Sequence, residues 1–166
     1  MSLSHDIPLW ILIGLPGSGK STWAQAMQQS SPSLKYISTD RIRRELFGDE
    51  AIQGPWRQVW HQVLQEFQLG VQQASSAGGV GAIYDATNAR RRGRRQVIAA
   101  ARIVGFTRLL AVWLDLPLEI CLQRNYQRSR QVPPEVIHGM ARQLTGAPPH
   151  WQEGFDAVYR TLLPTK

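Results

Sequence analysis

Residues 13–22, IGLPGSGKST, constrain the fold of this chain more than any other feature of its sequence. They match the pattern Gly-x-x-x-x-Gly-Lys-Ser/Thr, in which a glycine-rich turn points several backbone N–H groups inward. An apolar run precedes the turn and a helical pattern follows it, which is the strand–loop–helix context that the motif requires. Because inward amides and a helix N-terminus attract anions, the stretch predicts a site for the phosphates of a nucleotide.

The predicted phosphate site covers the turn and the start of the helix behind it. Its residues are Gly14, Pro16, Gly17, Ser18, Gly19, Lys20, Ser21 and Thr22. We expect Lys20 to reach the β- and γ-phosphates of ATP. We expect Ser21 to ligate Mg²⁺, a hard cation that prefers oxygen.

Short apolar runs alternate with helical patterns along the rest of the chain. Strands are predicted at 8–13, 34–38, 81–85 and 108–115, and helices at about 19–29, 40–48, 55–77, 89–104, from 117 and from 133. Segment 155–163 fits either a last short strand or a helix, and most of the six tryptophans are expected in the core or in helix–sheet packing. The alternation predicts an α/β fold of the P-loop NTPase type. We expect a doubly wound parallel sheet of about five strands in the order 2-3-1-4-5, with helices on both faces, in one domain over residues 1–166.

Composition adds a strong positive charge to this pattern. The chain has 19 lysines and arginines against 12 acidic residues, and only Lys20, Lys35 and Lys166 are lysines. Arginine's planar fork suits bidentate phosphate contacts, which favours a nucleotide or nucleic-acid partner, although an arginine-rich solvated surface is the alternative.

Other features of the sequence bear on location. No apolar run approaches the roughly 20 residues of a membrane span, and the first residues lack the basic and apolar regions of a secretory signal. The single cysteine, Cys121, excludes an internal disulfide and is expected to be buried. We therefore expect a cytoplasmic protein with no membrane partner.

Ligands in open α/β sheets bind beyond the carboxyl ends of the strands. After the second predicted strand, Asp40 and Arg43 lie three residues apart and share a helix face, unless Asp40 or a neighbour only caps the helix and Arg43 is solvated. Asp85 ends the third strand, where an acid that holds Mg²⁺ is expected. Asp115 ends the fourth strand and is a second candidate for that acid, although it also suits a turn or cap.

Arginines are concentrated in two segments that follow strands. Positions 90, 91, 92, 94 and 95 are all arginine at a helix start, where positive charge is unfavourable, which makes a phosphate-bearing partner more plausible, although a solvated basic face is the alternative. Just before them, Asn88 could cap that helix. Further on, Arg124 and Arg128 lie one helical step apart before Pro133-Pro134, and Arg130 could join them. This second segment, residues 124–134, predicts a mobile lid over a nucleotide.

Five segments together resemble the group of P-loop kinases that contains polynucleotide 5′-hydroxyl kinases and their small-substrate relatives. They are GLPGSGKST, TDRIR, YDATN, RNYQRSRQVPPEVI and EGFDAVYR, and the resemblance as a whole extends from residue 9 to about 160. The resemblance implies ATP-dependent phosphoryl transfer with Mg²⁺, most directly to the 5′-hydroxyl of DNA or RNA. A kinase for a sugar, nucleoside or antibiotic and a nucleotide-gated binding module are the alternatives.

The resemblance also implies roles for individual residues. Asp40 would accept the proton of the acceptor hydroxyl, and Arg43 would bind the acceptor's neighbouring phosphate. Arg124 and Arg128 would contact the donor phosphates, with Lys20, Asp40 and Arg128 as the catalytic residues. Asp85 would support the metal beside Ser21, and Thr87 and Asn88 from the same motif would lie on the acceptor side.

Overall fold

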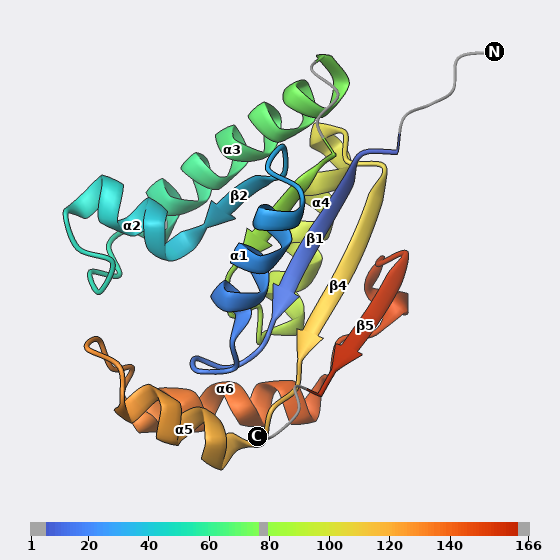
Figure 1. The fold of residues 1–166 in the computed structure, drawn as a ribbon. Helices are drawn as coiled ribbons and strands as arrows, with labels where there is room; N and C mark the ends of the chain where they lie inside the picture. Colours follow the sequence, from blue (N-terminus) through green and yellow to red (C-terminus); the bar gives the residue numbers. More distant parts are fainter. Residues whose placement is uncertain (1–5, 77–79, 163–166) are drawn as a thin grey trace.

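A five-stranded parallel sheet forms the centre of the molecule (Figure 1). The computed structural model describes residues 6–76 and 80–162. The strands are β1 (Pro8–Ile13), β2 (Lys35–Ser38), β3 (Ala82–Asp85), β4 (Arg108–Leu114) and β5 (Ala157–Thr161), paired in parallel in the order β2-β3-β1-β4-β5. The predicted fold class and strand order are therefore confirmed, and segment 155–163 forms a strand rather than a helix where it is described.

Helices cover both faces of this sheet and its carboxyl end. They are α1 (Lys20–Ser30), α2 (Thr39–Phe47), α3 (Trp56–Ser76), α4 (Arg91–Val104), α5 (Leu118–Tyr126), α6 (Pro134–Gly146) and the short 3-10 helix η1 (Trp151–Glu153). In Figure 1, α1 covers one face, α3 and α4 lie behind the other, and α5 and α6 lie below the ends of the strand arrows. Residues 77 and 163, where two predicted elements end, lie outside the described residues.

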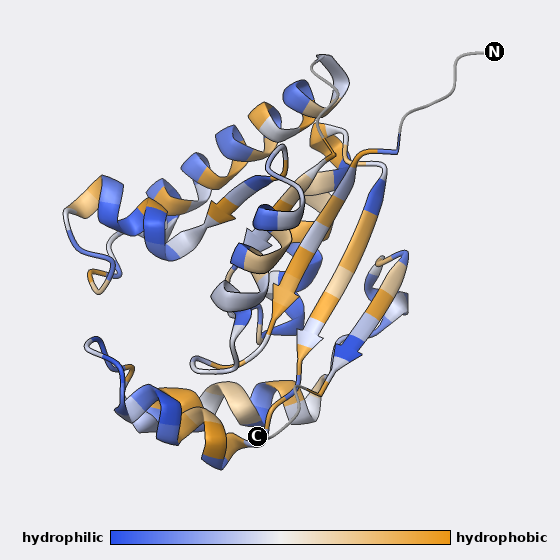
Figure 2. Ribbon diagram, viewed as in Figure 1, coloured by the Kyte–Doolittle hydropathy of each residue, from blue (hydrophilic) through white to orange (hydrophobic). Residues whose placement is uncertain are grey.

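The core follows from strands that are buried on both faces. In β1, Leu9, Ile11 and Ile13 pack toward the larger apolar cluster, while Leu12 packs toward a second cluster that includes Ala24 of α1. Figure 2 shows the same pattern, with hydrophobic strands and helices whose hydrophilic residues recur along their length. Such near-continuous apolar strands are expected in a parallel sheet covered by helices.

Two tryptophans depart from the expectation that these residues mostly pack in the core. Trp56 is 50% exposed and Trp151 is 63% exposed. Each begins a helix, so its side chain has few neighbours on the N-terminal side. The remaining four are partly buried against the two apolar clusters, and Cys121 is buried as predicted.

No helix within the described ranges is long and apolar enough to cross a membrane.

Candidate active site

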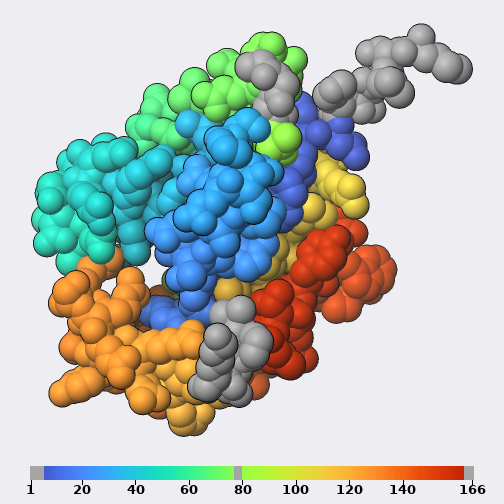
Figure 3. Space-filling view, viewed as in Figure 1, coloured from blue at the N-terminus to red at the C-terminus, as the bar shows by residue number. Residues whose placement is uncertain are grey.

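A large cleft opens at the carboxyl ends of the strands, with a volume of about 1590 Å³. Its walls come from the glycine-rich turn, the start of α2, the end of β3, the first turns of α3, and the segment that follows α5. In Figure 3 the cleft opens between α2, in cyan, and the end of α5 with the loop after it, in orange. One cleft thus brings together the glycine-rich turn, the start of α2, the end of β3 and the predicted lid, whereas Asp115, after β4, does not line it.

The glycine-rich turn lies between β1 and α1 and is packed tightly on α5. Gly17 and Gly19 adopt φ values of 83° and 91°, in the left-handed region that glycine tolerates. A Cβ atom on Gly17 would lie 2.6 Å from the carbonyl oxygen of Cys121, so no side chain fits there. Gly19 precedes α1 without a side-chain cap, which leaves first-turn N–H groups available to an anion.

Lys20 lies inside the turn that it follows. Its Nζ donates hydrogen bonds of 2.9 Å to the carbonyl oxygens of Gly14 and Leu15. Burial lowers the pKa of Lys20 below its ordinary value, and the carboxylates of Asp85 and Asp40 oppose that shift. A bound anion would likewise favour the charged form of this lysine.

The side chain of Ser18 faces the base of the turn rather than the cleft, because a Cβ atom on Gly14 would lie 2.6 Å from its Oγ and Ser18 does not line the cleft. Ser18 is fully buried, and its Oγ has no hydrogen-bond partner among the described residues. A buried polar atom without a partner is costly unless a ligand or water satisfies it. The uncapped amides at the start of α1 and the side chain of Lys20 are the groups of the turn that fit the phosphates of a nucleotide.

Asp85, at the end of β3, holds two hydroxyl groups beside the turn. Its Oδ2 accepts a hydrogen bond of 2.8 Å from Ser21 Oγ and one of 2.7 Å from Tyr36 OH. Burial and the nearby Asp85 raise the pKa of Tyr36 to about 12, so this phenol remains a donor at neutral pH. Asp115 accepts a 2.8 Å hydrogen bond from Arg160 Nε instead, which favours Asp85 of the two candidate metal-associated acids.

Asp40 and Arg43 form an ion pair on one face of α2. Arg43 Nη1 lies 3.1 Å from Asp40 Oδ1, and the arginine side chain is only 13% exposed. The helix is capped by Ser38, whose Oγ accepts a hydrogen bond from the backbone N–H of Arg41. Asp40 is therefore not used as the cap, and Arg43 is not a solvated surface residue.

Aromatic rings adjoin this ion pair. The guanidinium carbon of Arg43 lies 6.0 Å from the ring centroid of Trp56, within reach of a cation–π contact. Trp56 in turn stacks on Trp60 at 6.1 Å between centroids. Asp40, Arg43 and both tryptophans line the cleft, so one wall combines a carboxylate, a guanidinium and exposed aromatic surface.

The predicted lid, residues 124–134, faces α2 across the cleft. The spacing of Arg124 and Arg128 predicted that they share a helix face. That prediction is wrong, because helix α5 ends at Tyr126 and Arg128 lies in the turn after it. Both arginines nonetheless line the cleft. Arg130 Nη1 lies 3.3 Å from Asp40 Oδ2 and 3.3 Å from Glu50 Oε1, which joins this segment to the opposite wall.

The lid loop is closed on itself by one buried side chain. Asn125 donates Nδ2 to the carbonyl oxygen of Val132 at 2.8 Å and accepts its N–H at 2.9 Å. Asn125 is 3% exposed. The contact ties the two ends of the loop that carries Arg128 and Arg130.

Thr87 and Asn88 follow β3 and line the cleft. The carbonyl oxygen of Thr87 accepts the N–H of Gly14 at 3.1 Å, and Asn88 Nδ2 donates to the carbonyl oxygen of Leu12 at 2.7 Å. Arg90, not Asn88, is the residue that precedes α4 as its N-cap, so the capping alternative for Asn88 is wrong. Both residues therefore brace the glycine-rich turn against the loop after β3.

One of the five clustered arginines lies in the core rather than on the surface. Arg94 is fully buried, and its Nε and Nη2 donate to the two carboxylate oxygens of Glu153 at 2.8 and 2.7 Å. The pair is separated by 59 positions in the sequence, so no local pattern could have predicted it. Tyr36 was also missed, although it lies two positions before Ser38 and so on the same face of β2; it does not line the cleft but reaches the site through its hydrogen bond to Asp85.

Comparisons with known proteins agree with this geometry. The AAA_33 family model, described as an AAA domain, matches residues 9–147. The L-seryl-tRNA(Sec) kinase of Methanococcus maripaludis is 27% identical over 136 residues, which cover 80% of this chain and 50% of that protein. The chain thus spans about half the length of this curated relative.

Solved structures with a similar fold include kinases of several kinds. The Pnkp1/Rnl/Hen1 RNA repair complex matches with a TM-score of 0.71 at 24% identity, over 93% of this chain and 48% of that one. A fungal RNA kinase matches at 0.66 and 17% identity, over 96% and 39%. A gluconokinase from Sinorhizobium meliloti matches at 0.56 and 17% identity, over 96% and 85%. At these identities the likeness establishes the fold.

Proposed function

The chain belongs to the AAA_33 family of AAA domains, and on this premise we propose that it is a P-loop kinase that transfers the γ-phosphate of ATP to the 5′-hydroxyl of a nucleic acid. One observation carries the proposal: a carboxylate, Asp40, lines the same cleft as Lys20 of the phosphate-binding turn. A nucleotide holder needs only the turn, whereas transfer also needs a group that can take a proton from an acceptor. We also propose that the described residues form one kinase domain, with residues 124–134 as its lid.

The donor side of the cleft would bind the triphosphate of ATP. The free amides of the turn, Lys20, Arg124 and Arg128 would neutralise its charge, which is most of what phosphoryl transfer requires of a protein. Ser21 and Asp85 would hold Mg²⁺, and the metal would supply further charge neutralisation at the phosphates. The hydrogen bond between these two residues already places both oxygens at one point beside the turn.

The acceptor side would align a hydroxyl with the γ-phosphorus. The hydroxyl oxygen would form the new P–O bond while the bond from the γ-phosphorus to the oxygen that bridges it to the β-phosphate breaks. The hydroxyl proton would pass to Asp40, and ADP would leave. Arg43 would bind a phosphate next to the acceptor hydroxyl, and Thr87 and Asn88 would keep the loop after β3 in place.

The relatives favour a nucleic-acid acceptor. The Methanococcus maripaludis relative is named for a seryl-tRNA substrate, and two structures of similar fold belong to an RNA repair complex and to an RNA kinase. A small hydroxyl compound is the second candidate, since the gluconokinase has a similar fold over 96% of this chain. The aromatic wall at Trp56 and the pairing of Arg43 with Asp40 suit a nucleotide with its own phosphate.

An acceptor screen tests the proposal. The protein is incubated with ATP labelled at the γ-phosphate and with 5′-hydroxyl strands of DNA and RNA, alongside a gluconate, shikimate and nucleoside panel. Label on a strand supports the proposed acceptor. Label only on a small compound supports the second candidate, and ATP binding without transfer to any acceptor would reject a kinase.

Two variants separate the roles of the acceptor residues. Asp40→Asn should lower kcat by about 100-fold or more, because general-base assistance is worth that much, and it should keep ATP affinity. Arg43→Ala should raise the KM for a strand far more than the KM for ATP. Glu45→Gln, an exposed carboxylate on the same helix that is paired with Arg41, is the matched control and should change neither.

A further inference from the structure

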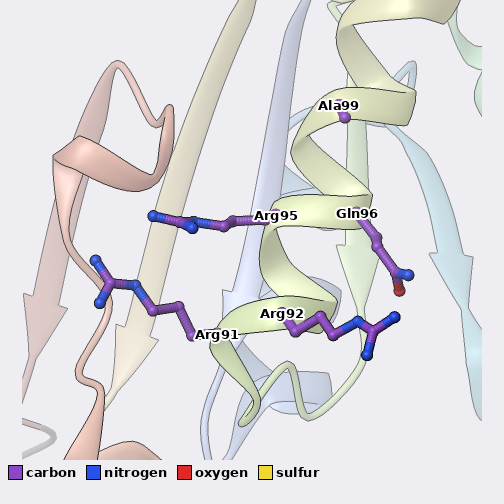
Figure 4. A pocket seen from close by; sticks show the side chains of 5 residues that line it. All are labelled: Arg91, Arg92, Arg95, Gln96 and Ala99. Carbon is purple, nitrogen blue, oxygen red and sulfur yellow. The ribbon is translucent and has the colours of Figure 1, made fainter.

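The exposed face of α4 carries a group of positive side chains outside the cleft. Arg91, Arg92, Arg95, Gln96 and Ala99 line a shallow hollow of about 460 Å³ on this helix. In Figure 4, Arg91 and Arg95 extend to one side of the helix, and Arg92 and Gln96 extend to the other. We call Arg91, Arg92 and Arg95 the α4 arginine face.

These three charges have no counterpart on the protein. Within residues 6–76 and 80–162, none of them forms an ion pair or a side-chain hydrogen bond, and the first turn of α4 contains no acidic residue. Four exposed arginines elsewhere do pair with carboxylates, namely Arg44 with Glu50, Arg102 with Asp156, Arg108 with Asp6, and Arg160 with Asp115. The helix N-terminus adds its own partial positive charge. The α4 arginine face is therefore an uncompensated cationic surface that an anionic partner would stabilise.

This surface is continuous with the acceptor side of the cleft. Gln96 lines both the hollow and the cleft, and Arg90 and Gly93, which precede Gln96 in the sequence, also line the cleft. Arg91 and Arg95 lie about 6 Å apart along the helix axis at 1.5 Å per residue, a distance over which arginine side chains can contact successive phosphates of a strand. A chain that leaves the cleft over Gln96 would reach the arginine face directly.

We propose that the α4 arginine face binds the phosphodiester backbone of the acceptor strand beyond the nucleotides held in the cleft. The inference rests on the proposed function and deepens it, because it makes the acceptor an extended strand rather than a mononucleotide or a small metabolite. Arginine forks suit successive phosphate groups without reading the bases. The surface therefore selects for chain length and not for sequence.

The test compares acceptors of different length at different salt concentrations. Values of kcat/KM are measured for a 5′-hydroxyl nucleoside 3′-phosphate and for a single strand of about 16 nucleotides. The variant Arg91→Gln/Arg92→Gln/Arg95→Gln is compared with a matched triple that removes three exposed arginines elsewhere. The matched triple is Arg57→Gln/Arg108→Gln/Arg142→Gln, whose residues do not line the cleft.

Wild-type protein should prefer the long strand, and salt should weaken that preference. The α4 triple should lower the ratio of kcat/KM between long and short acceptors about tenfold or more. It should also reduce the slope of log Kd for the strand against log salt concentration by about 2, since each single-strand phosphate contact contributes about 0.7. The matched triple should retain most of the wild-type ratio and slope.

Several outcomes would overturn the inference. A wild-type enzyme that phosphorylates both acceptors equally well, or equal losses in the two triples, would show that the α4 arginine face does not bind the strand. Equal competition by polyglutamate would show a general anion surface instead. If no nucleic acid accepts phosphate, the proposed function fails, but strand binding measured by fluorescence anisotropy still decides the inference. Salt-sensitive binding that is lost only in the α4 triple supports it. Absence of salt-sensitive binding in the wild-type protein rejects it.

Discussion

Removing the charge of Glu153 should destabilise this protein more than removing the charge of any exposed acid. Both Glu153 and Arg94 have side chains that are fully buried, and the guanidinium makes two hydrogen bonds to the carboxylate. Arg94 also donates to the carbonyl oxygens of Asn88, Ala89 and Ala147. The substitution Glu153→Gln keeps the side-chain shape and leaves a buried guanidinium without its counter-charge.

The expected loss follows from that burial. Breaking a buried ion pair by changing one partner costs about 3–5 kcal/mol. We expect the lower end, about 3 kcal/mol, because three carbonyl oxygens still accept from Arg94 and one amide oxygen remains at position 153. At an m value of about 2 kcal/mol per M, this lowers the urea midpoint by about 1.5 M. The exposed pair of Arg41 and Glu45 should be worth less than about 0.5 kcal/mol.

Urea unfolding followed by tryptophan fluorescence measures the effect. The control is Glu45→Gln, whose midpoint should stay within about 0.25 M of wild type at the same m value. If Glu153→Gln also stays within that range, the guanidinium has found another partner and the reasoning from burial fails. Because Arg94 holds the carbonyl oxygens of Asn88 and Ala89, the same variant should reduce phosphoryl transfer at urea concentrations that leave it folded.

Further predictions concern the aromatic wall and Asp85. Trp56→Ala should raise the KM for a strand about 5- to 160-fold, from the 1–3 kcal/mol of a stacked base, whereas Trp151→Ala, which removes a similarly exposed tryptophan outside the cleft, should not. Tyr36→Phe removes a donor to Asp85 and should raise the Mg²⁺ concentration for half-maximal activity about tenfold. Since the pKa of Tyr36 is raised from 10.0 to about 12, wild-type stability should gain from this phenol below pH 10 and lose that gain as the pH rises toward 12, as pH-dependent unfolding compared with Tyr36→Phe would measure.

Much of the fold could be predicted from the sequence because its signals are local. The apolar runs at 8–13 and 108–115 are nearly continuous, as strands buried on both faces must be, and β1 and β4 match them to within one residue. Element ends were less certain, since caps depend on single hydrogen bonds. Asn88 illustrates this: asparagine is a common N-cap residue, yet the side-chain amide of Asn88 donates to the carbonyl oxygen of Leu12 in a neighbouring strand.

The residues of the site likewise divide into those that local sequence predicts and those that depend on tertiary contacts. The turn around Lys20 is one contiguous stretch, so its geometry follows from a motif. The acid at Asp85 could be proposed because it ends a strand, but its bond to Tyr36 joins positions that are 49 apart. The buried pair of Arg94 and Glu153 and the exposed ring of Trp56 depend on tertiary packing, and neither burial nor exposure of these residue types follows from their neighbours in sequence.

The contacts of Asp40 explain how the two halves of such a site would be coordinated. Its carboxylate oxygens face Arg43 from its own helix and Arg130 from the lid loop, and Arg130 also reaches Glu50. In the proposed reaction an acceptor hydroxyl would need one of those oxygens. Arg130 can leave Asp40 and still keep an ion pair with Glu50, whereas Arg43 has no second carboxylate partner among the described residues. Entry of the acceptor would therefore release Arg130 from Asp40, while the ion pair of Arg130 with Glu50 keeps the lid attached to the opposite wall. The carboxylate of Asp40 would then become available only when an acceptor hydroxyl is bound beside it.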